Sequence, residues 1–279
     1  MSLPPHHAKI GPDGDRVHKY KTAEDAEDAE GNDLNKPLRP LRPLRLSGAA
    51  GNVRWAALAC DYDGTLASSG RVRPATLEAL AQVRRSRRKL LLVTGRELKE
   101  LFDVFPPITI FDRVIAENGA VIYDPASGKR RLLAHRPSRK LVGALRARRL
   151  APLSVGRAIV ATSRAQRRVV SHVIDELGLP LAVILNKRSL MVLPQGVSKA
   201  SGLLGALREI GIAPKDTVGV GDAENDEDFL ALCGYSAAVA NALPRLKRKV
   251  DVVTSAGYGA GVVELVKHLL NGANTPQVF

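Results

Sequence analysis

Cysteine is scarce in this 279-residue sequence, which contains only Cys60 and Cys233. Two cysteines so far apart have neither the spacing of a zinc site nor the number needed for a disulfide framework. No apolar run reaches the roughly 20 residues of a membrane-spanning helix, and the first residues lack the apolar core of a signal peptide. We therefore expect a globular protein in the cytoplasm, without a membrane partner.

Acidic and aromatic residues are scarce in the middle of the chain. Residues 124–195 contain 15 Lys and Arg against 3 Asp and Glu, so they carry most of the formal net charge of +14. A positive surface of this kind attracts anionic ligands. The same segment has no Phe, Tyr or Trp, the side chains on which proteins stack single-stranded bases. A nucleic acid is therefore a disfavoured partner, although binding to a phosphate backbone stays open.

Residues 1–52 differ from the rest in composition. An acidic triplet repeat fills residues 23–30, and Pro-Leu-Arg repeats fill residues 37–46. Neither segment has the apolar residues to build a core, so we expect a disordered low-complexity tail. A plain linker is a better interpretation of the tail than a docking motif. The remaining chain is long enough to bury a sizeable core.

From residue 53 onward, predicted strands and helices alternate, which is typical of an α/β fold with a mainly parallel, doubly wound sheet. The expected strands are 53–59, 89–93, 114–116, 120–123, 217–221 and two near 237 and 252. The expected helices are 74–88, 97–104, 198–211, 224–232 and 261–270. Segment 124–195 interrupts this rhythm with strands in 129–134, 158–162 and 181–193 and helices in 139–149 and 164–177. We therefore predict a core of 53–123 and 196–279 with a small inserted α+β cap domain, 124–195.

Two carboxylates separated by one residue follow the first predicted strand. Asp61 and Asp63 come after an apolar run, and Gly64 lets the chain turn sharply behind them. Alternation along a strand places both side chains on one side, where like charges raise each other's pKa unless a cation lies between them. Carboxylate oxygens are ligands that Mg²⁺ prefers. Taken alone, the stretch also fits a strand followed by an Asp-Gly turn.

Polar residues follow two further predicted strands in the same way. Thr94, Gly95 and Arg96 follow one of them, and Asp222 opens an acidic loop after the other. Ligands of open parallel sheets bind outside the carboxyl ends of the strands, so Asp61, Thr94 and Asp222 should converge there. Either loop alone fits an ordinary strand-to-helix connection, whereas the three residues together indicate a site.

Lys199 adds a positive charge to this set. It lies in the first turn of the helix that Ser198 caps, where a cation opposes the helix dipole. A solvated surface lysine would explain it in isolation. Beside the carboxylates and Thr94, a lysine that binds phosphate oxygens is the better interpretation.

Together these residues resemble the four motifs of the haloacid dehalogenase superfamily of phosphohydrolases. The motifs match in order at Asp61–Leu66, Thr94, Lys199 and Gly221–Phe229, and the resemblance spans about residues 53–270. Smaller motifs are similar to the Cof-type and sucrose-phosphatase-like branch, which carries an α/β cap between its threonine and lysine motifs. These smaller motifs are Thr94-Gly95-Arg96, Glu117-Asn118-Gly119-Ala120, Asn225-Asp226 and Val239-Ala240-Asn241-Ala242.

The resemblance implies a Mg²⁺-dependent phosphatase that forms an aspartyl-phosphate. Asp61 would be the nucleophile, and Asp63 would protonate the leaving alcohol and then activate water. The implied metal ligands are Asp61, the carbonyl of Asp63, Asp222 and Asp226. The implied phosphate-binding residues are Thr94, Gly95 and Lys199. Arg96, Asn118 and Asn225 are candidates for substrate contacts, and a structural role fits Arg96 and Asn118 equally well.

A basic cap implies a small anionic phosphorylated metabolite as substrate, such as a sugar phosphate or a phospho-acid. A solvated basic face is an equally good interpretation of the cap arginines. A phosphotransferase would need the same core residues. A binding or scaffold protein that uses the basic cap is a third hypothesis, although such a relic would tolerate losses among the motif residues. A receiver-type signalling module is contradicted by the order of the acidic residues.

Overall fold

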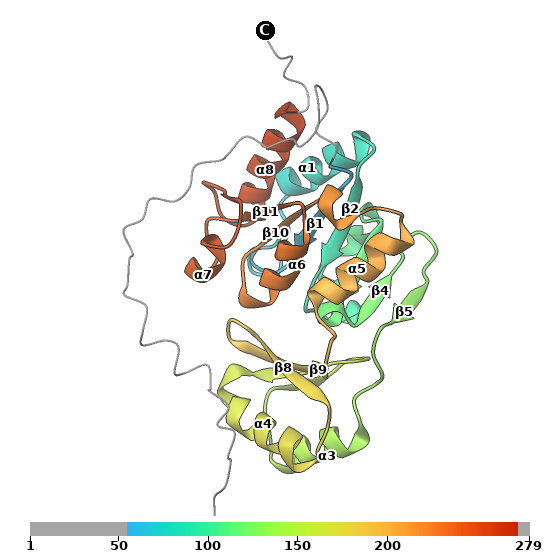
Figure 1. Ribbon diagram of the computed structural model, residues 1–279, viewed down its shortest axis with the longest axis vertical. Coiled ribbons are helices and arrows are strands. Elements are labelled where there is room, and N and C mark those ends of the chain that lie inside the picture. Colours follow the sequence, from blue (N-terminus) through green and yellow to red (C-terminus); the bar gives the residue numbers. More distant parts are fainter. Residues whose placement is uncertain (1–54, 273–279) are drawn as a thin grey trace, which may run out of the picture. The chain divides into compact units, whose positions relative to one another are not determined.

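The computed structural model describes residues 55–272, and the interpretation of residues 1–52 as a tail lies outside this range. The described chain forms an eight-stranded sheet and a four-stranded sheet (Figure 1). The strands of the large sheet, in chain order, are β1 (Ala57–Asp61), β2 (Lys89–Val93), β3 (Arg113–Ala116), β4 (Val121–Tyr123), β5 (Arg130–Leu132), β10 (Thr217–Gly221), β11 (Tyr235–Ala238) and β12 (Val252–Val253). The helices around it are α1 (Pro74–Arg85), α2 (Leu98–Val104), α5 (Lys199–Glu209), α6 (Glu227–Leu232), α7 (Pro244–Lys247) and α8 (Tyr258–Gly272).

The large sheet grows in two directions from its centre, in the spatial order β12-β11-β10-β1-β2-β3-β4-β5. All six strands β1–β3 and β10–β12 are parallel to their neighbours. From the centre, β2 and β3 are added on one side of β1, and β10, β11 and β12 are added on the other. Right-handed crossovers that move in opposite directions place their helices on opposite faces. Every residue of β1 and β10 is accordingly buried. The predicted doubly wound sheet is confirmed, and its topological switch point lies between β1 and β10.

Element ends differ from the sequence prediction by a few residues. The first strand extends to Asp61 itself instead of ending before it. The helix expected at 224–232 divides into a 3₁₀ turn, η6 (Glu224–Asp226), and α6. Strand 129–134 was expected in the inserted unit, but β5 pairs antiparallel with β4 and extends the core sheet. Its three exposed residues form a charged sheet edge, and such edges resist pairing with other chains.

The four-stranded sheet belongs to the insert between β5 and α5, which we call the cap. Its strands are β6 (Leu153–Val155), β7 (Val160–Ser163), β8 (Leu181–Asn186) and β9 (Ser189–Pro194), all antiparallel in the order β6-β7-β9-β8. Its helices are α3 (Arg139–Ala147) and α4 (Arg167–Glu176). The expected small α+β unit is present, with β6 as a strand that the sequence analysis did not predict.

Alternation along β9 divides the cap into two sides. Leu190 and Val192 pack with α3 and α4 in one apolar cluster. Met191 and Leu193 point to the other face and pack with Ala120 of the core. A strand presents successive side chains to opposite faces, so β9 buries one face against its own helices and the other against the core.

Helix α5 approaches the core so closely that only glycine fits at the contact. A methyl group built on Gly202 would lie 2.6 Å from the Cα of Gly119 and 2.6 Å from a side-chain carbon of Ile115. A methyl group on Gly119, whose φ is +103°, would lie 1.9 Å from the carbonyl oxygen of Ser198. This contact sets the position of the first turn of α5, which begins at Lys199.

The contact predicts opposite effects for two Gly→Ala substitutions inside helices. Gly202→Ala should lower the free energy of unfolding by about 1–3 kcal/mol, because the added methyl group overpacks the core. Gly143→Ala in α3 should raise it by about 0.5–1 kcal/mol, because the site is open and alanine favours a helix. Urea unfolding of both variants measures the two effects. Equal effects of the same sign would contradict the close approach of α5.

Candidate active site

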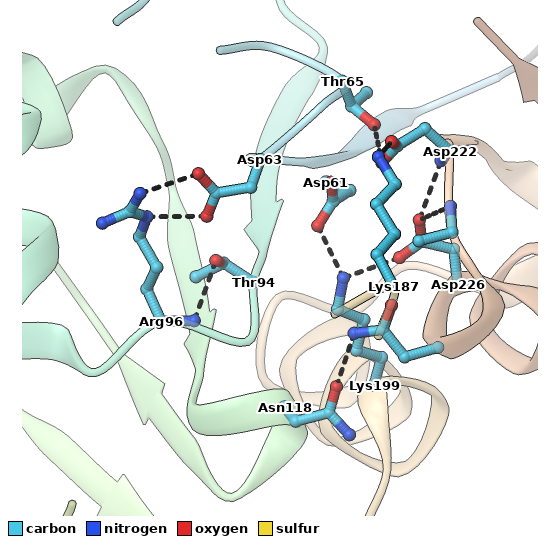
Figure 2. Close-up of polar contacts among 12 residues, drawn as sticks. Asp61, Asp63, Thr65, Thr94, Arg96, Asn118, Lys187, Lys199, Asp222 and Asp226 are labelled. Atoms are coloured by element: carbon cyan, nitrogen blue, oxygen red, sulfur yellow. Dashed lines mark hydrogen bonds and ion pairs between the residues drawn. The ribbon is translucent and has the colours of Figure 1, made fainter. Parts of the chain in front are cut away.

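Three buried carboxylates meet at the carboxyl ends of β1 and β10 (Figure 2). Asp61 ends β1, Asp222 follows β10, and Asp226 ends the η6 turn. One oxygen from each lies within 4.8 Å of the others, and none of the three residues is more than 4% exposed. The site therefore forms at the topological switch point, where open α/β sheets bind their ligands.

Lys199 supplies a buried cation to this cluster. Its Nζ donates to Asp61 Oδ1 at 2.5 Å and to Asp226 Oδ1 at 2.6 Å, and the residue is 1% exposed. Ser198 caps α5 by accepting a hydrogen bond from the backbone N–H of Ser201. The close packing of α5 and this cap together point a lysine at the first helical position into the core instead of into solvent.

The loop after β10 is shaped by the side chain of Asp226. Its Oδ2 accepts hydrogen bonds from the backbone N–H groups of Asp222 at 2.8 Å and Ala223 at 2.9 Å. A methyl group on Gly221 would lie 2.7 Å from that same oxygen. Asp226 thus has one oxygen for the loop and one for Lys199, which fixes its carboxylate beside that of Asp222.

Burial and mutual repulsion shift the protonation of this cluster. Burial, followed by the charge of Asp226, raises the pKa of Asp61 well above its ordinary value. The same two causes raise the pKa of Asp222, against the opposing effect of Lys187. Burial disfavours the charged form of Lys199, but the carboxylates of Asp226 and Asp61 outweigh it and raise its pKa. The ionised cluster is thus short of positive charge.

Asp63 lies in the loop after β1, two residues beyond Asp61, but it pairs with a different cation. Arg96 donates from Nε to Asp63 Oδ2 at 2.6 Å and from Nη2 to Asp63 Oδ1 at 2.8 Å. Figure 2 shows the Asp63 carboxylate directed toward this guanidinium, while the Asp61 carboxylate is directed toward Lys199. Asp61 and Asp63 therefore face different cations, Lys199 and Arg96.

The remaining predicted residues lie in loops next to the acidic cluster, where Figure 2 shows Thr94 and Asn118. The backbone N–H of Arg96 donates to the hydroxyl of Thr94 at 3.1 Å, and Thr94 is buried. Asn225 donates from Nδ2 to Asn118 Oδ1 at 2.9 Å, while the buried Oδ1 of Asn225 has no partner among the described residues. A methyl group on Gly95 would lie 3.2 Å from Sδ of Met191, so the cap reaches this loop.

Four residues that the sequence analysis did not assign to the site contact it or join the cap to the core. Thr65 donates from its hydroxyl to Asp222 Oδ1 at 3.1 Å, and Lys187 of the cap forms an ion pair with Asp222. Glu117 accepts from three successive backbone N–H groups of the cap, residues 157–159, at 3.1, 2.7 and 3.3 Å. Glu224, in the η6 turn, accepts a hydrogen bond from Arg164 of the cap at 3.1 Å.

The arginines on and beside the cap helices lie away from the acidic cluster. Arg148, which follows the last residue of α3, pairs with Glu176 of α4 at 2.5 Å. This pair lies on the side of the cap sheet away from the residues of β9 that face the core. Five arginines on or beside these helices are exposed: Arg146, Arg148, Arg149, Arg167 and Arg168. Their arrangement is that of a solvated face, and the cap residue at the acidic cluster is Lys187.

A sheet of this topology with an inserted cap, and carboxylates and a lysine at its switch point, defines a class of hydrolase. A sequence profile of the haloacid dehalogenase-like hydrolases matches residues 58–145 and 182–266, more than half of the chain. The chain therefore belongs to this family of hydrolases, as the four motifs predicted.

Two curated relatives match over most of their length, and another over less than half. Phosphoglycolate phosphatase of Haloarcula marismortui is 30% identical, over 75% of this chain and 95% of that protein. The Aeropyrum pernix enzyme of the same name is 28% identical, over 83% and 99%. A shorter match, to phosphoglycolate phosphatase of Methanoculleus marisnigri, is 39% identical and spans 34% of this chain and 41% of that protein.

Solved structures share the fold. A haloacid dehalogenase-like hydrolase from Bacteroides thetaiotaomicron has a TM-score of 0.68 and 19% identity, over 77% of this chain and 99% of that one. A subclass IIB sugar phosphatase has a TM-score of 0.64 and 18% identity, over 76% and 98%. Within residues 55–272, no helix is long and apolar enough to cross a bilayer.

The buried position of Lys199 predicts a large stability loss when its charge is removed. Lys199→Met should lower the free energy of unfolding by about 3–5 kcal/mol, because Asp61 and Asp226 lose their buried partner. The matched control is Lys89→Met, whose half-exposed pair with Asp112 should contribute less than about 1 kcal/mol. Urea unfolding without divalent metal compares the two. Equal losses would show that Lys199 does not compensate the carboxylates.

The raised pKa of Asp222 predicts a pH-dependent gain for Asp222→Asn. An unfolded Asp loses its proton near its ordinary pKa of 3.8, whereas folded Asp222 retains it to higher pH. Above 3.8 the folded state therefore binds more protons, and its stability falls as pH rises. In chelator, Asp222→Asn should melt higher than wild type at pH 7, with a difference that shrinks toward pH 4.

Asp124→Asn provides a control of opposite sign. Hydrogen bonding from the Ser127 hydroxyl lowers the pKa of Asp124, so its ionised form stabilises the fold above the ordinary pKa. This variant should melt lower than wild type at pH 7, and its difference should also shrink on acidification. An Asp222→Asn protein that melts lower than wild type at pH 7 would contradict the excess of negative charge at the site.

Proposed function

We propose that this protein is a metal-dependent phosphomonoester hydrolase that uses Asp61 as its nucleophile. The observation that carries the proposal is the buried Lys199, which holds the Asp61 carboxylate within the acidic cluster at the switch point. The names of the curated relatives support phosphatase chemistry on a small phosphorylated acid. A phosphotransferase would use the same first step, so the experiment below measures release of free phosphate.

The first step forms a bond between an Asp61 oxygen and phosphorus while the ester P–O bond breaks. Asp63 gives a proton to the departing alcohol oxygen. In the second step water attacks the phosphorus of the aspartyl-phosphate, and Asp63 takes the proton of that water. Phosphate leaves, and the Asp61 carboxylate is restored. Arg96 donates to both oxygens of Asp63 and therefore positions its ionised form, which takes the proton of the water in the second step.

Phosphate oxygens need positive charge and N–H or O–H donors around them. Lys199, the hydroxyl of Thr94 and the backbone N–H of Gly95 are the groups that we assign to this role. Preorganised donors of this kind, in a site from which water is excluded, are usually the largest part of catalysis by such enzymes. Asn118 and Asn225 lie beside these groups and offer amide contacts to the substrate.

The residues fit a divalent cation. Three buried carboxylates, two of them with pKa values raised by burial and repulsion, place hard oxygen donors within 4.8 Å of one another. We assign Asp61, Asp222, Asp226 and the carbonyl of Asp63 as the residues that would hold it, and Mg²⁺ as the ion, since oxygen ligands of this kind suit it. When bound, the ion would neutralise charge on the phosphoryl oxygens.

The proposal predicts Mg²⁺-dependent release of phosphate from an aryl phosphate that is lost in Asp61→Asn. The substitution removes the nucleophilic carboxylate while keeping its shape, so turnover should fall at least about 10³-fold, as when a nucleophile is removed elsewhere. Lys89→Met, far from the acidic cluster, should retain the wild-type rate. Wild-type activity that survives in Asp61→Asn would overturn the mechanism. Absence of activity from a folded, Mg²⁺-loaded wild type, with phospho-acids also tested, would overturn the function.

A further inference from the structure

Lys187 is the cap residue whose charged group enters the acidic cluster. It lies in the two-residue turn between β8 and β9 with a φ of +51°, and its ammonium contacts Asp222 Oδ2. Figure 2 shows the side chain extending past Asp61 to Asp222. A methyl group on Gly64 would lie 2.8 Å from this ammonium and 2.1 Å from Asp222 Oδ2. The missing side chain at Gly64 thus makes room for the ion pair.

The backbone of the Lys187 turn is held in place by two residues. Glu224 Oε2 accepts from the backbone N–H of Lys187 at 3.0 Å, and Arg164 Nη1 donates to the carbonyl of Lys187 at 3.1 Å. Arg164 also pairs with Glu224. The Lys187 side chain is 40% exposed, whereas that of Asp222 is fully buried. A fixed backbone with a partly solvated side chain lets the ammonium change partners without movement of the cap.

The charges of the site leave Lys187 available once a divalent cation binds. Asp61, Asp222 and Asp226 face two ammonium groups, those of Lys187 and Lys199, and Asp63 has Arg96. The two charges of a divalent ion and the single charge of Lys199 together balance the three carboxylates, without a contribution from Lys187. Like charges repel strongly in a partly buried site, so the ion would weaken the contact between Lys187 and Asp222.

The cap also contacts the core near this point through Met191. Met191 lies against Gly95, with 3.2 Å between its sulfur and a methyl group built there, and it packs in the apolar cluster with Ala120 and Ala158. The cap therefore holds the Lys187 ammonium next to the acidic cluster, while Met191 packs beside Gly95. This chemistry suits a short leaving group that carries one negative charge.

We propose that Lys187 determines substrate specificity by binding a carboxylate on the leaving group of the phosphomonoester. The inference rests on the proposed function and narrows it to phospho-acids, in which a carboxylate lies a few bonds from the ester oxygen. An ammonium provides charge-assisted hydrogen bonds to such a group, and a phosphate ester without the carboxylate leaves that ammonium without a partner.

The test compares phosphoglycolate with ethyl phosphate, which has a similar size but no carboxylate, in wild type, Lys187→Met and Arg188→Met. Lys187→Met should raise KM for phosphoglycolate at least about tenfold, which corresponds to ~1.4 kcal/mol, and should change KM for ethyl phosphate less than about threefold. Arg188→Met removes an equal charge from the same exposed turn and should change neither. Lys187→Arg should restore part of the preference.

Metal binding provides a readout that does not depend on turnover. Because the ion competes with Lys187 for Asp222, Lys187→Met should bind Mn²⁺ several-fold more tightly by calorimetry, while binding phosphoglycolate more weakly. A residue with a merely structural role would weaken both. Equal effects of Lys187→Met on phosphoglycolate and ethyl phosphate, or a wild type that does not distinguish them, would overturn this inference and leave the phosphatase intact.

Failure of the phosphatase assignment can be distinguished from failure of the Lys187 inference. If no ester is hydrolysed by the Mg²⁺-loaded wild type, the phosphatase assignment is wrong. The carboxylate site can then still be tested by binding. Phosphoglycolate binding is compared between metal-loaded Asp61→Asn and the metal-loaded double variant with Lys187→Met. Weaker binding only in the double variant would support the site, and unchanged binding would overturn it.

Discussion

The ammonium of Lys199 between the carboxylates of Asp61 and Asp226 is the interaction on which the arrangement of this site depends. Removing ions from water costs several kcal/mol for each, and only close partners with good geometry offset that cost. The two carboxylates come from opposite sides of the switch point, and the lysine comes from a helix that follows the whole cap. The interaction therefore requires β1, the loop after β10 and α5 to be in register at once.

Glycine residues allow β1, the loop after β10 and α5 to come close enough for this interaction. At Gly119 and Gly202 the first turn of α5 meets the backbone of the turn after β3, and at Gly64 and Gly221 the carboxylates occupy the space of missing side chains. A larger residue at any of the four would move a charged group by more than a hydrogen bond tolerates. These positions contribute to chemistry through the atoms that they lack.

Two carboxylates of the core, those of Glu117 and Glu224, also bind the cap. Glu117 accepts three backbone N–H groups from the loop before β7, and Glu224 binds both Arg164 and the backbone of Lys187. The basic character of segment 124–195 thus has two separate uses. Arg146, Arg148, Arg149, Arg167 and Arg168 lie on a solvated face of the cap helices, while Arg164 and Lys187 face the acidic rim of the core. Net charge alone would not distinguish these groups, because it carries no information about which face of the cap each side chain occupies.

Local patterns in the sequence predicted the alternation of strands and helices, the switch-point sheet, the inserted cap and the residues that converge at the strand ends. These features depend on periodicity and on short motifs whose positions follow from topology. Contacts between segments that are far apart in the sequence were not predicted. β5 was assigned to the cap because its Arg-rich sequence resembles its neighbours, although pairing with β4 decides its place. Lys187 has an unremarkable position in a turn, and it reaches Asp222 only because Glu224 and Arg164 fix that turn.

The surplus of negative charge explains why such a site needs both lysines. Repulsion among buried carboxylates raises the pKa of Asp61 and Asp222, so the ionised site is less favourable than the same side chains in water. Folding tolerates this cost because the rest of the β1–β10 core is apolar and closely packed, and because each ammonium removes part of the repulsion. A site that is short of positive charge binds a cation more readily than a neutral one. In our proposal, such a cation displaces Lys187 from Asp222, and the fixed backbone of Lys187 keeps its charge near the site for the next ligand.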